Sequence, residues 1–155
     1  MYRFGDLVAL ARLSWVGQMT SRLEALGYAG FRRGDAAVMR ILRQGPLPVG
    51  RLGAALGVSR QAARKIADAL EQRGYATTER DSRDSRRLNV TLTPVGRDYA
   101  RAVILVTEEL NREIAGRVSP AQLAAADTVL RAAMFDDSAR QRAGQLPSPP
   151  GQPAS

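Results

Sequence analysis

The residues best suited to bind a charged ligand lie in one short run. Residues 79–93 read ERDSRDSRRLNVTLT, with four arginines and three acids in the first nine positions, followed by alternating apolar and polar residues. Arginine presents a planar fork of donors that matches phosphates and base edges. Alternation with a period of two is typical of a half-buried strand, so the run predicts the tip and return arm of a β-hairpin.

A second set of donors lies upstream, on a predicted helix. When residues 60–71 are advanced by about 100° per residue, one side is apolar and the other carries Arg60, Gln61, Arg64 and Lys65 near its start. Cations at a helix N-terminus oppose the helix dipole, which favours acids there. The stability of the helix itself therefore does not explain why its cationic residues come first. Binding to an external partner explains this placement.

The residues before this helix predict a helix-turn-helix. Leu52 and Leu56 mark a helix of about two turns, and Gly57 is suited to the left-handed conformation of a tight turn. Val58 is expected to fill the angle between the helices, and Ser59 to cap the second helix. The pattern predicts two helices joined by a short turn.

The flanking elements are also mainly helical. Apolar residues at steps of three and four predict helices over about 6–26 and 33–43, and Thr93-Pro94 starts a long helix to about 117. Ser119, Pro120 and Gln122 form a capping box for a last helix, and residues 75–80 and 88–92 form two strands. Residues 1–135 are expected to form one domain, with 136–155 a disordered tail rich in Ser, Gln, Pro, Gly and Ala.

Composition excludes most enzyme classes. The chain has neither cysteine nor histidine, so disulfides, the commonest transition-metal ligands and the usual Ser/His or Cys/His catalytic pairs are absent. We expect no catalytic residue, no metal site and no cofactor. No segment approaches the roughly 20 apolar residues of a membrane span, and MYRFGDL is unlike a secretory signal, so we expect a cytoplasmic protein with no membrane partner.

The net charge of +8 comes from the middle of the chain. Residues 32–101 hold fifteen Arg and Lys against seven Asp and Glu, whereas the two ends are close to neutral. A basic segment between near-neutral ends is the footprint expected of a protein that binds a polyanion such as nucleic acid.

A helix-turn-helix followed by a basic hairpin is the winged helix plan, which suits duplex DNA. The major groove, about 12 Å wide, admits one helix, and the narrow, negative minor groove accepts an extended cationic side chain. At the hairpin tip, Asp81 and Asp84 alternate with Arg83, Arg86 and Arg87. The two aspartates are expected to orient the arginine side chains.

The runs LGVSRQAARKIADALEQRGY and ERDSRDSRRLNVTLTPVG resemble the multiple-antibiotic-resistance regulator (MarR) family of bacterial transcription factors. The resemblance covers about residues 6–135. It implies a winged helix over about 32–93, flanked by dimerisation helices over about 6–26 and 94–135. It further implies a homodimer, commonly a repressor, on a palindromic operator. In that reading Arg86 enters the minor groove, Asp81 braces it, and Arg60, Gln61 and Arg64 lie where the recognition helix meets bases. The further candidate DNA-binding residues on the same helix and hairpin are Ser59, Lys65, Arg83 and Arg87.

The resemblance also implies a small aromatic or anionic effector bound between the dimer helices and the winged helix. Trp15, Met19, Tyr28 and Met39 are the candidate lining residues, although such residues on apolar helix faces usually belong to the core. Two alternatives remain open. The winged helix could dock an acidic protein partner, or it could bind DNA architecturally without sequence preference.

Overall fold

The structure is a computed structural model, and it describes residues 3–144 and 146. The described chain is mainly helical with one small antiparallel sheet, as the sequence predicts. Its elements are α1 (Phe4–Ala25), α2 (Asp35–Leu42), β1 (Leu47–Pro48), α3 (Val49–Leu56), α4 (Arg60–Gln72), β2 (Ala76–Arg80), β3 (Leu88–Leu92), α5 (Pro94–Ala115), α6 (Pro120–Ala132) and α7 (Asp137–Ala143).

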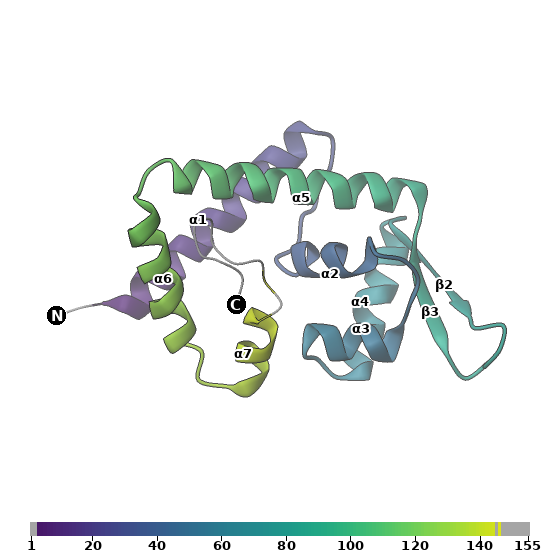
Figure 1. The fold of residues 1–155 in the computed structure, drawn as a ribbon. Helices are drawn as coiled ribbons and strands as arrows, with labels where there is room; N and C mark the ends of the chain where they lie inside the picture. The colour runs from purple at the N-terminus through teal and green to yellow at the C-terminus, as the bar shows by residue number, and fades with distance from the viewer. Residues whose placement is uncertain (1–2, 145, 147–155) are drawn as a thin grey trace.

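These elements form two parts connected by α5 (Figure 1). α2, α3, α4 and the sheet form a winged helix head, α6 lies at the other end of α5, and α1 runs from beside α6 to about the middle of α5. The head is packed around a core to which α1 contributes Met19 and Leu23, and α5 contributes Tyr99, Val103 and Val106. The N-terminal part of α5 is thus part of the head's core, and its C-terminal part extends away from the head.

The wing is the predicted hairpin, with one strand that the sequence does not reveal. β2 pairs antiparallel with β3, placing Ala76 opposite Leu92 and Arg80 opposite Leu88. β1 pairs with the other edge of β3 through Leu47 and Pro48, so the strand order is β1-β3-β2. A strand of two residues is too short to show a periodicity in the sequence. Its pairing partners, Val90 and Asn89, also lie far along the chain.

The predicted starts of α4, α5 and α6 are confirmed by their caps. Ser59 accepts a hydrogen bond from Ala62 N, Thr93 accepts one from Gly96 N, and Ser119 forms a full capping box with Gln122. Gly57 adopts the left-handed conformation, with φ of 66°, that turns α3 into α4. The helix-turn-helix therefore has the local chemistry that its sequence predicts.

Two predictions are wrong. Val58 does not fill the angle between α3 and α4 but is 38% exposed, and the core there is closed by Leu52, Ala63 and Ala67. Disorder from residue 136 is contradicted over residues 137–143, which form α7. Asp136 caps that helix by accepting from Ala139 N, a local signal that the low-complexity composition obscures. Residues 145 and 147–155 of the expected tail lie outside the described residues.

The apolar stripe of α1 is only partly covered. Met19 and Leu23 are buried, but Leu10 and Leu13, on the same predicted stripe, are 62% and 70% exposed. α6 contains no buried residue, and its Val129 and Leu130 are about half exposed. In the described part of the chain, no helix is long and apolar enough to cross a membrane.

Candidate nucleic-acid interface

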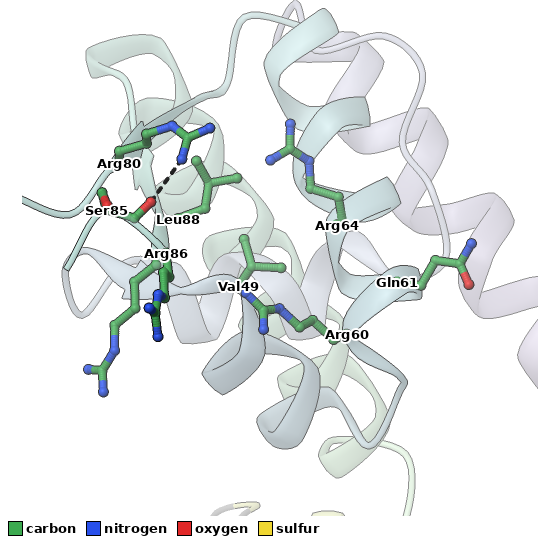
Figure 2. A pocket seen from close by; sticks show the side chains of 9 residues that line it. Val49, Arg60, Gln61, Arg64, Arg80, Ser85, Arg86 and Leu88 are labelled. Carbon is green, nitrogen blue, oxygen red and sulfur yellow. Dashed lines mark hydrogen bonds between the residues drawn. The ribbon is translucent and has the colours of Figure 1, made fainter.

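A groove lies between the outer face of α4 and the wing. It has a volume of about 470 Å³, and its lining residues are Val49, Arg60, Gln61, Arg64, Arg80, Ser85, Arg86, Arg87 and Leu88. Five of these nine residues are arginine and none is acidic. Figure 2 shows Arg60, Gln61 and Arg64 on the helix and Arg80 and Arg86 across the groove on the wing. The two basic elements that the sequence predicts separately therefore form one surface.

The helical side of this surface is fixed by the packing of α4. Ala63, Ala67 and Leu70 are buried against the rest of the head, which turns Arg60, Gln61 and Arg64 outward, where all three are exposed. Arg64 Nε pairs with Asp68 Oδ1 at 2.8 Å one turn later, which holds its guanidinium along the helix. Ser59 acts as the helix cap, so its hydroxyl already accepts a hydrogen bond.

Lys65 is separated from the other predicted reading residues. It is exposed, but it lines a different cavity, of about 280 Å³, between α2 and α4. Asp35 and Arg73 line that cavity as well. One residue along a helix turns a side chain by about 100°, so Lys65 points away from the groove that Arg64 lines.

The wing tip is ordered by its two aspartates through the backbone. Asp81 Oδ1 accepts from the N–H groups of Arg83 and Asp84, at 2.8 and 3.1 Å, and its Oδ2 accepts from Asn89 Nδ2 at 2.9 Å. These bonds, that from Asn89 above all, hold the pKa of the Asp81 carboxyl below its ordinary value. Asp84 accepts from Arg86 N at 3.1 Å and pairs with Arg87 Nε at 3.4 Å.

This arrangement leaves two wing guanidinium groups available. Within the described residues, the side chains of Arg83 and Arg86 make no ion pair or hydrogen bond, and both residues are exposed. The aspartates thus shape the loop by accepting from backbone N–H groups, without neutralising these two guanidinium groups. Arg86 lines the groove, whereas Arg83 does not.

Arg80 is a groove residue that the sequence analysis missed as a site. It ends β2 and donates from its guanidinium to the carbonyl oxygen of Ser85, at 2.9 Å, across the wing loop (Figure 2). The sequence does contain a signal for this residue, because Arg80 is one of the four arginines in residues 79–87. The sequence predicts a strand that ends at Arg80, and a strand residue beside the tip gives no local sign that its side chain reaches the groove.

Sequence analysis also missed a buried polar network behind α4. Asp35 is 5% exposed, and its carboxylate accepts from both terminal nitrogens of Arg73, at 3.1 and 2.9 Å, and from Tyr99 Oη at 2.6 Å. The ring of Tyr99 stacks on Tyr75 with centroids 4.2 Å apart. Burial first, and then the bond to Asp35, raise the pKa of the Tyr99 phenol.

The network connects three elements of the head. Asp35 begins α2, Arg73 follows the end of α4, and Tyr99 lies in the second turn of α5. The C-terminal end of α4 is thereby attached to α5. No sequence periodicity signals this, because the three residues are 26 to 64 positions apart.

The four residues suggested for an effector pocket lie in different surroundings. Met19 and Met39 are fully buried in the core, and Tyr28 packs at an angle on Tyr99. Trp15 lines two cavities. One of about 390 Å³ lies between α1 and α5, and one of about 650 Å³ lies between α1 and α6. The cavity between α1 and α6 is strongly apolar, with Leu7, Val8, Val129 and Leu130 in its walls.

Solved structures share this fold at low sequence identity. A MarR mutant from E. coli complexed with operator DNA matches with a TM-score of 0.68 at 19% identity, over 84% of this chain and 92% of that one. The MepR–DNA complex of S. aureus matches at 0.69 and 17%, over 86% and 100%. BpsR of Bordetella bronchiseptica, described as regulated in DNA binding by 6-hydroxynicotinic acid, matches at 0.68 and 23%, over 88% and 99%.

The sequence comparison matches a shorter part of the chain, and that part contains the five groove arginines. Residues 29–87, which run from the segment before α2 to the end of the wing loop, match the MarR family. No curated protein matches the chain. The resemblance read from the sequence is therefore confirmed on the elements that form the groove, since residues 29–87 match the MarR family and the described chain shares the fold of the MarR and MepR structures.

Proposed function

We propose that this protein is a sequence-specific, duplex-DNA-binding transcriptional regulator. The observation that carries the proposal is the groove between α4 and the wing, which five arginines line without an acidic residue. A surface of this charge attracts a polyanion. A helix, α4, forms one wall of the groove, and the wing loop forms the other. Two of the structurally similar proteins were solved in complex with DNA.

In this proposal each side of the groove has its own role. α4 enters the major groove, where Arg60, Gln61 and Arg64 donate to base edges and phosphates. The wing lies along the adjacent backbone, and Arg86 reaches into the minor groove from a loop that Asp81 and Asp84 hold in shape. Arg80 and Arg87 supply further cationic charge close to the phosphates.

Uncovered apolar surface supports a homodimer. The cavity between α1 and α6 is walled by apolar side chains, and Leu10, Leu13 and Phe135 are also widely exposed. A patch of this kind on a soluble protein marks an interface, and a second copy is the simplest cover for it. Two copies would present two α4 helices to half-sites about 34 Å apart on one face of the duplex.

Repression and release by a small ligand complete the proposal. A head that occupies an operator blocks other proteins from the same DNA, and a ligand that changes the spacing of the heads would release it. The similarity to BpsR supports a small aromatic anion as effector. Trp15, which lines the two cavities beside α1, is the candidate contact.

Selection of bound duplexes from a random pool, followed by gel shifts, tests the proposal. We expect an enriched palindrome, bound with an affinity that falls steeply with salt. Arg86→Ala is expected to weaken binding by about 1–3 kcal/mol. The control is Arg112→Ala, which removes the same charge from an exposed position on α5. Wild-type affinity for Arg86→Ala would remove the wing from the mechanism.

The same experiment distinguishes the alternatives. Equal affinity for the selected and a scrambled duplex would indicate an architectural DNA-binding protein. Absence of salt-dependent DNA binding would favour an interaction module that docks an acidic protein on the same basic groove.

A further inference from the structure

The C-terminal helix α7 reaches back to the helix-turn-helix of its own chain. Arg142 NH1 donates to the carbonyl oxygen of Leu56, the last residue of α3, at 2.7 Å. The same guanidinium packs on Gly57, where an added methyl group would lie 2.5 Å from NH1. Arg142 is half-buried, and the neighbouring Ala143 is 4% exposed. In Figure 1, α7 lies between α6 and α3.

The chemistry of this contact is that of a helix C-cap supplied from a distance. The last carbonyls of a helix have no partner within it and carry partial negative charge, which favours a cation. Gly57 provides both the left-handed turn and the space for the guanidinium. Any side chain at this position would displace Arg142.

The corner between α6 and α7 is itself braced. Arg140 donates from Nε to the Met134 carbonyl at 2.9 Å, and its NH1 pairs with Asp137 Oδ1 at 3.0 Å. Asp136 caps α7 by accepting from Ala139 N at 2.7 Å. A continuous path of ordered contacts therefore runs from α6 through α7 to the turn before α4.

The head is thus attached to the rest of the chain at two separate places. The first is the core that the head shares with α1 and the start of α5, where Met19 is buried, Tyr99 bonds Asp35 and Gly96 lies close against the Tyr75 carbonyl. The second is Arg142 at the turn between α3 and α4. One attachment leaves a rigid body free to swing about it, whereas two restrict its orientation.

We propose that Arg142 is a positioning residue, and that α7 is a strap which sets the orientation of the DNA-reading head relative to the dimerisation helix α6. This proposal rests on the proposed function. In a dimer, the strap on each chain would keep the two α4 helices at the separation and angle that one operator spacing requires. Loss of the strap leaves each head able to bind a half-site but relaxes the preference for spacing.

The test compares full-length wild type, Arg142→Ala and the control Gln141→Ala, an exposed neighbour on the same helix. The probes are the palindrome selected from the random pool, the same duplex with two base pairs inserted between the half-sites, and a single half-site. The insertion rotates one half-site by about 70° around the duplex axis. Hydrogen exchange of the Gly57 and Val58 amides is measured on the free proteins.

For wild type and Gln141→Ala we expect strong preference for the uninterrupted palindrome. For Arg142→Ala this preference should fall by about tenfold, as expected for the loss of one charged hydrogen bond, with half-site affinity unchanged. The turn amides should exchange faster in Arg142→Ala alone. A uniform loss of affinity on all three probes would indicate a charge or stability effect and overturn the proposal.

The exchange measurement keeps the strap testable without DNA. If wild type selects no duplex, the proposed function fails, and the strap is judged by exchange at the turn. Unchanged exchange in Arg142→Ala would overturn the strap even where the protein binds its operator well.

Discussion

The buried carboxylate of Asp35 supports the sharpest prediction about stability. Replacing it with alanine removes the acceptor for Arg73 and for the Tyr99 hydroxyl in one step. The side chains of Asp35 and Arg73 are only 7% and 15% exposed, so water does not readily replace the lost partner. The change therefore leaves a largely buried cation without its counter-charge.

The size of the effect follows from these contacts. Breaking a buried pair by removing one partner costs about 3–5 kcal/mol. Arg73 keeps a bond to the Gly30 carbonyl at 3.0 Å and lies 4.8 Å from the centre of the Tyr75 ring, so the lower end applies. We expect Asp35→Ala to lower the free energy of unfolding by about 3 kcal/mol, and the melting temperature by roughly 6–12 °C.

Urea unfolding followed by circular dichroism, at one protein concentration, measures the change. Asp98→Ala is the matched control, because its ion pair with Arg101 is exposed and is expected to contribute at most about 1 kcal/mol. The double variant Asp35→Ala, Arg73→Met should be more stable than the sum of its single changes predicts, since no unpaired charge remains. An Asp35→Ala variant as stable as Asp98→Ala, or strictly additive single changes, would refute the reasoning.

Three other changes test separate parts of the structure. Gly96→Ala should cost about 3 kcal/mol, because the new methyl would lie 1.8 Å from the Tyr75 carbonyl oxygen, and a melt close to wild type would contradict that approach. Asp81 has a lowered pKa, so the order it gives the wing is complete above its ordinary value of 3.8 and is lost as pH falls through its lower folded value. A carboxyl NMR titration should place its midpoint below 3.8, and a higher midpoint would contradict the bonds described. Val129→Glu, in the cavity between α1 and α6, should yield monomers in sedimentation, and an unchanged dimer would place the interface elsewhere.

Local patterns in the sequence were sufficient for the elements themselves. Ser59, Thr93 and the Ser119–Gln122 capping box mark helix starts through bonds within four residues, and the alternation in residues 88–92 marks a strand face. The concentration of arginine in the middle of the chain identified the basic segment. Each of these signals depends on neighbours along the chain, so the tertiary arrangement is not needed to read it.

The tertiary structure decided which residues act together. Arg80 joins Arg64 and Arg86 in one groove while Lys65 faces another cavity, because packing fixes the rotation of α4 against the sheet. The Asp35–Arg73–Tyr99 network and the contact of Arg142 with α3 span 26 to 86 residues. Pairings at such separations form only when the chain has folded, since their energy comes from burial and geometry that no local window of sequence contains.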